Sequence, residues 1–248
     1  MSPLPLMLFA AGFGTRMKPL TDDRPKPLIE VAGKPLVDHA LDLAQEADCT
    51  PIVANLHYRA EQLEHHLAGT GVVTLVERPD ILDTGGGLRN ALGVLGGDTV
   101  VTMNTDAIWS GPNPIDLLQR AWEPDRMDAL LICIELARAT GYDGTGDFTL
   151  GPDGRLIRGP GVLYGGVQII KTELLHDIPE NVFSLNLLWN MMLDSKRLFG
   201  LSYPGFWCDV GHPAGIAQAE EMLVSQCLNQ QVNRGSSGWH PASISRPD

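Results

Sequence analysis

The chain has 248 residues, of which 44% are hydrophobic, and it carries a formal net charge of −12 at pH 7. This length is enough for one good-sized core in an α/β sheet with helices on both faces. The acidic charge argues against nucleic acid polymers and anionic membranes as partners, because long-range attraction would have the wrong sign. A small anionic ligand stays compatible with this charge if cations gather locally.

Short apolar runs alternate with helical patterns over the first 140 residues. In chain order the patterns predict strand 6–11, helix 34–47, strand 51–56, helix 60–69, strand 71–77, helix 86–96, strand 98–104, helix 114–122 and strand 127–136. A regular alternation of strands and helices is typical of a parallel sheet with right-handed crossovers. We therefore assign residues 1–140 to the first half of one domain.

The order loosens after residue 140. The patterns predict a hairpin over 146–159 with its turn at Pro-Asp-Gly, strand 164–171, helix 181–195, extended segments 197–203 and 206–211, and helix 213–228. Beyond residue 228 the chain is rich in Gly, Ser, Pro and Asn and has no periodicity. We predict one domain over 1–228, whose second half is 141–228, and a carboxyl-terminal tail at 229–248.

The cysteine pattern and the amino-terminal segment indicate a reduced, cytoplasmic protein. Cys49, Cys133, Cys208 and Cys227 are widely spaced and form no Cys-x-x-Cys pair, so neither a disulfide framework nor a zinc site is expected. No stretch approaches the ~20 apolar residues of a membrane helix. No basic residue precedes the apolar run 6–11, so we interpret that run as a strand rather than a signal peptide.

The segment AAGFGTRMKPLTDDRPKPL has residue types suited to phosphate, although it is neither of the two familiar phosphate loops. Met17 stands where a dinucleotide fingerprint needs its third glycine, and no Gly-Lys-Ser/Thr follows. Gly12 and Gly14 let backbone N–H groups approach phosphate oxygens closely. Thr15 adds a hydroxyl donor, and Arg16 adds a forked cation. The alternative interpretation is a solvated turn.

Lys26 lies between two prolines, Pro25 and Pro27. The prolines predict an extended backbone at Lys26, restrained out of the helical region, so that the direction of its side chain is set in advance. A pre-aimed ammonium contributes more at a transition state than a mobile one, because little free energy is spent on ordering it.

The stretch FAAGFGTRMKPLTDDRPKPLIEVAGKPLVDHAL resembles the amino-terminal signature of the sugar-phosphate nucleotidyltransferases, the nucleoside-diphosphate-sugar pyrophosphorylases. The resemblance implies a three-layer, Rossmann-like nucleotidyltransferase fold with a mixed, mostly parallel sheet, helices on both faces and a small acceptor-binding lobe. It implies that the first half, 1–140, binds the nucleotide and that the second half, 141–228, binds the sugar phosphate. It also implies that Lys26 and Arg16 are catalytic residues on the phosphates at the reacting centre. By the same resemblance, the nucleoside triphosphate is surrounded by Ala11, Gly12, Gly14, Thr15, Arg16 and Lys26.

Two aspartates far apart in the chain are candidate ligands for Mg²⁺, which prefers oxygen and needs only one or two carboxylates. An isolated Asp at a strand end is as often a cap or turn residue. The resemblance favours function, because NTD at Asp106 and WCDVG at Asp209 match two family motifs. Thr105 replaces the usual glycine of the first motif. By resemblance Asp106 and Asp209 hold Mg²⁺, Asp106 is also catalytic, Asp209 also contacts the sugar phosphate, and Asn104 contacts the nucleotide.

The stretch LDTGGGLRNAL is either a flexible loop or a site that a flat base approaches closely. By resemblance Thr84, Gly85 and Gly86 meet the nucleobase. This version of the segment is most similar to the N-acetylmuramate 1-phosphate uridylyltransferases of cell-wall peptidoglycan recycling. GTGDFTL resembles the same branch and contains Gly146 and Asp147, where we expect sugar-phosphate contacts, and Gly166 is a further expected contact by its position. We expect Val182–Trp189 to shape the acceptor pocket, whereas Arg155 and Arg158 lie nearby without an assigned role.

The resemblance implies Mg²⁺-dependent transfer of a nucleotidyl group from UTP to N-acetylmuramate 1-phosphate with release of pyrophosphate and no covalent nucleophile. The expected partners are these two substrates, and we expect a monomer or a small homo-oligomer. The nearest alternative is a mannose 1-phosphate guanylyltransferase. A non-catalytic nucleotide-sugar sensor could lose Lys26 or either aspartate, so the presence of all three argues against it. Met17 argues against an NAD dehydrogenase.

Overall fold

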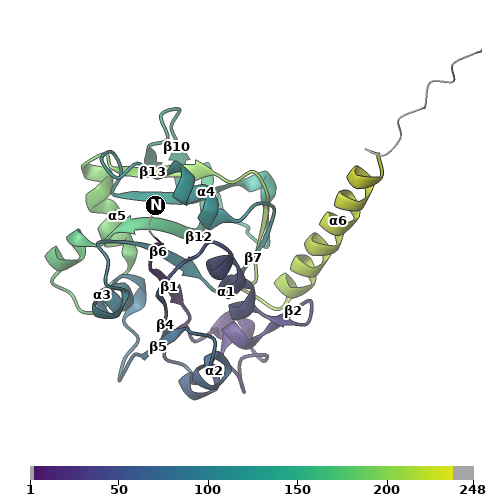
Figure 1. The fold of residues 1–248 in the computed structure, drawn as a ribbon, viewed down its shortest axis with the longest axis horizontal. Helices are drawn as coiled ribbons and strands as arrows, with labels where there is room; N and C mark the ends of the chain where they lie inside the picture. Colours follow the sequence, from purple (N-terminus) through teal and green to yellow (C-terminus); the bar gives the residue numbers. More distant parts are fainter. Residues whose placement is uncertain (1–2, 237–248) are drawn as a thin grey trace, which may run out of the picture.

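The computed structural model describes residues 3–236, in which a mixed sheet is enclosed between two layers of helices (Figure 1). The sheet runs in the order β11-β10-β12-β6-β1-β4-β5, and β8 pairs with both β12 and β13. Its strands are β1 (Leu6–Phe9), β4 (Ile52–Leu56), β5 (Val73–Val76), β6 (Thr99–Asn104), β8 (Ala129–Glu135), β10 (Phe148–Leu150), β11 (Leu156–Arg158), β12 (Val162–Lys171) and β13 (Leu198–Ser202). The predicted three-layer α/β architecture is confirmed.

The two faces of the sheet are covered by different sets of helices, because side chains on a strand alternate between faces. Leu6 and Leu8 of β1 belong to the core under α1, α2 and α4. Met7 between them belongs to the core under α3 and α5. The helices are α1 (Leu36–Glu46), α2 (Ala60–Leu67), α3 (Asp83–Leu95), α4 (Pro114–Ala121), α5 (Leu185–Asp194) and α6 (Ala214–Ser236). None of the described helices combines the length and the apolar character needed to cross a membrane.

Strand β12 connects the two halves of the domain. It runs antiparallel to β6 and pairs with it from Val167 to Lys171, while its first residue, Val162, pairs with Phe148 of β10. Because the strands are antiparallel, Val162 lies beyond the carboxyl end of β6. The β10–β11 hairpin therefore lies beyond the carboxyl end of β6, at the edge of the sheet where open α/β sheets bind ligands.

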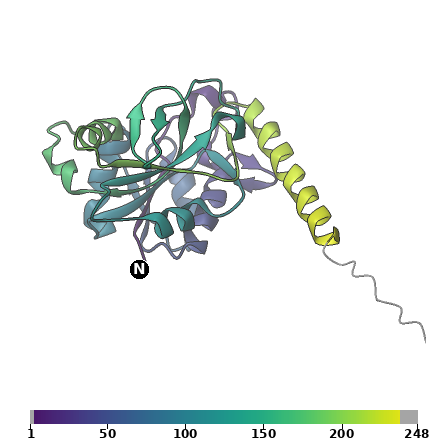
Figure 2. The same ribbon diagram turned by 90° about the horizontal axis from the view of Figure 1, so that it is seen from above.

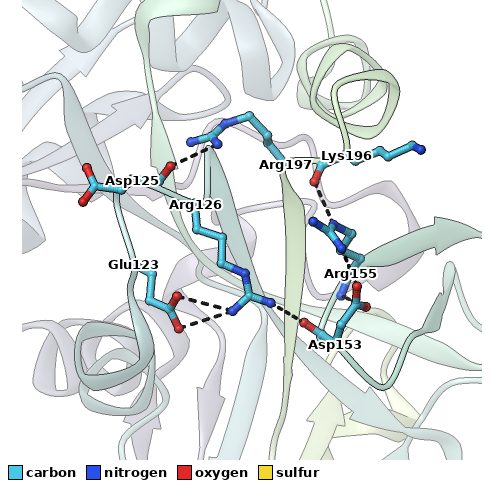
Figure 3. A network of polar contacts seen from close by, with 7 residues as sticks. All are labelled: Glu123, Asp125, Arg126, Asp153, Arg155, Lys196 and Arg197. Carbon is cyan, nitrogen blue, oxygen red and sulfur yellow. Dashed lines mark hydrogen bonds and ion pairs between the residues drawn. The ribbon is translucent and has the colours of Figure 1, made fainter.

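A polar network fastens the turn of this hairpin to the rest of the molecule (Figure 3). Arg126 pairs with Glu123 and donates to the backbone oxygen of Asp153 at 2.6 Å. Arg155 binds the carboxylate of the same Asp153 and the backbone oxygen of Lys196. Each exposed pair contributes little on its own. Together they link a hairpin turn, the loop before β8 and the start of β13.

A second sheet of three short strands brings distant segments together. It contains β7 (Ala107–Ser110), β14 (Phe206–Asp209) and β9 (Ala139–Thr140), with β14 in the centre. In the antiparallel β7–β14 register Asp209 lies opposite Ala107, and the Val210 N–H donates to the Asp106 backbone oxygen at 2.9 Å. The sequence patterns predicted β14 but missed β7 and β9, which are too short to show periodicity.

Helix α6 ends later than the sequence predicted. It continues past Leu228 to Ser236, and residues 237–248 of the predicted tail lie outside the described residues. A helix that is already nucleated extends at small cost through residues such as Gln and Asn. The beginning of α6 packs on β14 and on the hairpin of β2 (Glu30–Val31) and β3 (Lys34–Pro35), and the helix then leads away from the sheet (Figure 2).

Candidate active site at the carboxyl ends of β1 and β6

A cavity of about 270 Å³ opens at the carboxyl ends of β1, β4 and β6. Open α/β sheets bind ligands at this edge. The lining residues are Phe9, Ala10, Ala11, Gly12, Lys26, Pro27, Asn55, Ile81, Asp83, Thr84, Asn104, Thr105 and Asp106. The structure thus brings six sequence-predicted residues to one cavity, namely Ala11, Gly12, Lys26, Thr84, Asn104 and Asp106.

The first glycine segment forms an open turn at the mouth of this cavity. Gly14 has a φ of 62°, in the left-handed region that favours glycine. Its carbonyl oxygen accepts a hydrogen bond from the Thr21 hydroxyl at 2.9 Å. Among the described residues, no acceptor binds the backbone N–H groups of Ala11, Gly12 or Phe13. These donors are available to an anion.

Thr15 and Arg16 lie in a short 3₁₀ helix, Thr15–Met17, directly after this turn. Both side chains are exposed, and neither lines the cavity. The Arg16 guanidinium is nevertheless close enough to act electrostatically on Asp209. Contact between Arg16 and a bound phosphate stays a prediction.

Lys26 begins a 3₁₀ turn, Lys26–Leu28, so the prediction of an extended backbone at Lys26 is wrong. Pro27 lacks a backbone N–H, but the first positions of a helical turn need no such donor. The Leu28 N–H closes the turn on the Pro25 oxygen at 3.0 Å. The side chain of Lys26 is only 12% exposed, and its Nζ donates to Asp106 Oδ2 at 2.9 Å. The turn therefore holds the ammonium in one direction, although by a different geometry.

Asp106 and Asp209 are neighbours in space, as the sequence analysis required. The β7–β14 register places Asp209 opposite the residue after Asp106. Burial raises the pKa of the Asp209 carboxyl, and the negative charge of Asp106 raises it further. The positive charges of Lys26 and Arg16 oppose this increase in pKa. Two acidic groups and two cations thus share one site.

The two carboxylates fit the donor set of a hydrated Mg²⁺. This ion takes one or two carboxylates and completes its shell with water and substrate phosphates. Among the described residues, no cluster of three or more His, Cys, Asp and Glu side chains is arranged to hold a metal by itself. A divalent cation between Asp106 and Asp209 would relieve the repulsion that raises the pKa of Asp209.

A buried polar chain under the cavity was missed by the sequence analysis. Asn55 Oδ1 accepts from the Ala10 N–H at 3.0 Å, and Asn55 Nδ2 donates to Glu77 Oε1 at 2.7 Å. Glu77 Oε2 accepts from the Leu82 N–H at 2.8 Å. These three hydrogen bonds fix the start of the first glycine segment relative to the start of α3. The available signal was a polar residue inside one apolar strand, at Asn55, and another directly after the next strand, at Glu77.

The second glycine segment, Gly85–Gly87, does not line the cavity. The N–H groups of Gly85 and Gly86 both donate to the Phe183 backbone oxygen, at 2.9 and 3.1 Å. A Cβ at Gly85 would lie 2.3 Å from the Phe183 ring, and one at Gly86 would lie 2.5 Å from the Asn181 oxygen. Nucleobase contacts by Gly85 and Gly86 stay a prediction, because these donors are used inside the protein.

A second cavity of about 290 Å³ adjoins the first. Both are lined by Phe9, Asp83, Thr84 and Asn104, and the second is further lined by Asp147, Arg158, Tyr164, Ser184, Leu185, Asn186 and Trp189. Of the predicted sugar-phosphate residues, only Asp147 lines it.

The other predicted sugar-phosphate residues lie elsewhere. Gly146 packs closely on the backbone of residues 161 and 162, and Gly166 packs on the Asn104 side chain at an irregularity of β12. Asp209 lies beside Asp106. Their contact with a sugar phosphate stays a prediction.

The fold and the site define a nucleotidyltransferase. A family model described as MobA-like NTP transferase domain matches residues 6–231, and the chain belongs to this family. The crystal structure of HddC from Yersinia pseudotuberculosis complexed with GMP-PN has the same fold, with a TM-score of 0.71. It covers 88% of this chain and 98% of its own, at 20% identity.

Two curated relatives are more similar in sequence. A protein of Caulobacter vibrioides, named N-acetylmuramate alpha-1-phosphate uridylyltransferase, is 39% identical over 90% of this chain and 98% of its own. A protein of Neisseria meningitidis serogroup B with the same name is 31% identical over 87% of this chain and 96% of its own. The resemblance identified from the sequence motifs is confirmed.

Proposed function

We propose that the protein catalyses the Mg²⁺-dependent reaction of UTP with N-acetylmuramate 1-phosphate to give UDP-N-acetylmuramate and pyrophosphate. The observation that carries this proposal is the convergence of Lys26, Asp106 and Asp209 at the mouth of a cavity that follows the first strand. The names of the two curated relatives support the choice of substrates.

The chemistry requires one phosphate oxygen of the acceptor to attack the α-phosphorus of the triphosphate in line, while the bond to pyrophosphate breaks. In this proposal the open N–H groups of Ala11 and Gly12, which lie at the first cavity, would hold the triphosphate oxygens. The Lys26 ammonium offsets the negative charge that builds up on those oxygens. Its 3₁₀ turn and its pairing with Asp106 keep it aimed before the substrate binds.

Asp106 and Asp209 would hold Mg²⁺ through their carboxylate oxygens. When bound, the ion supplies charge neutralisation and a template for the reacting phosphates. The Lys26–Asp106 pair also keeps the Asp106 carboxylate from rotating away. The adjoining second cavity would take the sugar, because it shares Asn104 and Thr84 with the first cavity.

Pyrophosphate release from a panel of substrates tests the proposal. UTP, GTP, CTP, ATP and dTTP are each incubated with N-acetylmuramate 1-phosphate, N-acetylglucosamine 1-phosphate, mannose 1-phosphate or glucose 1-phosphate, with Mg²⁺ or with excess EDTA. We expect the highest kcat/KM with UTP and N-acetylmuramate 1-phosphate, and no release in EDTA.

The other outcomes decide between the alternatives. Release with GTP and mannose 1-phosphate alone would replace the uridylyl proposal by the guanylyltransferase. Tight nucleotide binding without release from any pair would favour the non-catalytic sensor.

A further inference from the structure

Arg158 stands out among the residues that line the second cavity. Lys26 in the first cavity and Arg158 in the second are the cations among the described lining residues. The second cavity is otherwise acidic or neutral, with Asp83 and Asp147 in its wall. A cation in the acceptor cavity of a protein with a net charge of −12 calls for an anionic group on the acceptor.

The Arg158 guanidinium is held in position by its neighbours. It lies over the Phe148 ring at 4.7 Å and the Trp189 ring at 5.7 Å. Its Nη2 donates to Asn186 Oδ1 at 2.8 Å and to Asn190 Oδ1 at 3.1 Å. Stacking and two hydrogen bonds fix the plane of the guanidinium, so the side chain loses little conformational entropy when a ligand binds.

The support beneath Arg158 is buried and fully paired. Trp189 Nε1 donates to Gln168 Oε1 at 2.9 Å, and Gln168 Nε2 donates to the Thr102 hydroxyl at 3.1 Å. Trp189 also packs edge-to-face against Tyr164. This arrangement anchors the platform for Arg158 in the central sheet through β6 and β12.

The donors of Arg158 are only partly used inside the protein. Among the described residues, Nε and Nη1 have no hydrogen-bond acceptor. Burial lowers the pKa of the guanidinium and the nearby Asp147 carboxylate raises it, so the group stays charged. The Nε–H and Nη1 hydrogens lie on different edges of the guanidinium, so each can donate a single charge-assisted hydrogen bond to a carboxylate oxygen.

Arg158 is separated from the reacting phosphates. Lys26 and Asp106 line the first cavity and Arg158 lines the second, with Asn104 and Thr84 in the wall common to both. A sugar whose 1-phosphate faces Asp106 would direct its far substituents toward Arg158. In N-acetylmuramate the 3-O-lactyl ether carries a carboxylate, and N-acetylglucosamine is the same sugar without it.

We propose that Arg158 binds the lactyl carboxylate of the acceptor and thereby selects N-acetylmuramate 1-phosphate over N-acetylglucosamine 1-phosphate. This inference rests on the proposed function and assigns the specificity of the same site to one residue. The matched pair of acceptors isolates the interaction, because they differ only in the lactyl group.

The test measures kcat and KM with UTP for both acceptors in the wild type, R158Q and R158K. For the wild type we expect a preference for the lactyl-bearing acceptor. In R158Q we expect the KM for N-acetylmuramate 1-phosphate to rise. The kcat/KM for this acceptor, divided by that for N-acetylglucosamine 1-phosphate, should fall by about 10- to 100-fold, which is the effect of losing one hydrogen bond between charged groups. The N-acetylglucosamine 1-phosphate values stay within about twofold and show that the variant is folded. R158K restores part of the ratio.

R155Q is the control on the same hairpin, because Arg155 faces Asp153 and Lys196 rather than the cavity (Figure 3). We expect it to leave the ratio unchanged. An equal loss for both acceptors in R158Q would overturn the inference, because Arg158 would then act on the shared phosphate or on the fold. An unchanged ratio would overturn it as well. If the wild type used neither acceptor, the proposed function itself would fail, and this inference with it.

Discussion

Two glycine-rich segments of this protein look alike in sequence and differ in structure. In the first segment, around Gly12 and Gly14, a Cβ at Gly12 would meet no atom within 4 Å, and the neighbouring N–H groups are open. In the second, Gly85–Gly87, each added Cβ would lie within 3.0 Å of a protein atom. At Gly12 the missing Cβ leaves open space that a ligand can enter, whereas at Gly85–Gly87 it makes room for other parts of the protein.

This difference shows that a run of glycines in a sequence does not by itself predict a ligand-binding site. Missing Cβ atoms permit close approach, but they do not say which group approaches. At Gly85 and Gly86 the approaching group is the 181–183 segment, whose Phe183 oxygen takes both N–H donors. That segment leads into α5 and the second cavity. The second glycine segment therefore positions a wall of the second cavity rather than forming a wall of the first.

The largest effect is expected at Lys26, which lines the first cavity. In Lys26→Ala, kcat falls by about 10²- to 10³-fold, because a pre-aimed charge at the transferring phosphate is lost. The melting temperature changes little, since Asp106 is 35% exposed and can be solvated. Lys18→Ala is the control, because Lys18 is an exposed lysine of the same segment that pairs with Asp22. A stable Lys26→Ala enzyme with full turnover would place the chemistry elsewhere.

The next largest effect is a loss of stability at Gly85. Alanine gains up to about 1 kcal/mol of helix propensity at such a position. The contact at 2.3 Å with the Phe183 ring outweighs this gain, and overpacking of this kind costs about 1–3 kcal/mol. Urea denaturation measures the free energy of unfolding, which we expect to fall.

Gly93→Ala is the matched control for Gly85→Ala in the same helix. Gly93 is exposed, and its added Cβ would meet no atom within 4 Å. It should therefore be stabilising by up to about 1 kcal/mol. Unchanged stability in Gly85→Ala, combined with a raised KM for the triphosphate, would show that Gly85 contacts the nucleotide after all.

Local patterns predicted most of the fold, because the strands and helices of the first half followed from apolar periodicity. The resemblance of NTD and WCDVG to family motifs pointed to Asp106 and Asp209, which the structure brings side by side. Their proximity depends on β7, whose four residues show no usable pattern.

The missed features arise from long-range pairing. The hydrogen bond between Asn55 and Glu77 could not be predicted, because it depends on β1, β4 and β5 lying side by side. Likewise, the burial of the second glycine segment depends on a contact with Phe183, almost a hundred residues later in the chain. Such contacts are absent from any local window of sequence.

A smaller effect is expected at Gly14, where a side chain disturbs both backbone and neighbour. Its φ of 62° costs alanine about 1–2 kcal/mol, and the added Cβ would lie 2.9 Å from Lys26 Cβ. We expect Gly14→Ala to lower stability by this amount and kcat by about tenfold, because Lys26 is displaced. Gly33→Ala has a similar positive φ without any neighbour within 4 Å, so it should lower stability and leave kcat unchanged. Equal kcat values for the two variants would contradict a coupling between Gly14 and Lys26.

The smallest effect on the fold is expected at Gly12, and it tests the comparison most directly. Gly12 is exposed, has no positive φ, and an added Cβ would meet no protein atom. The free energy of unfolding of Gly12→Ala should therefore stay within about 0.5 kcal/mol of the wild type. A bound triphosphate would occupy the same space, so its KM should rise several-fold while the KM for the acceptor stays constant. Calorimetric titration with the triphosphate gives the same comparison without turnover. A variant with unchanged triphosphate affinity would mean that the first segment leaves room for solvent only, and the distinction between the two segments would then be lost.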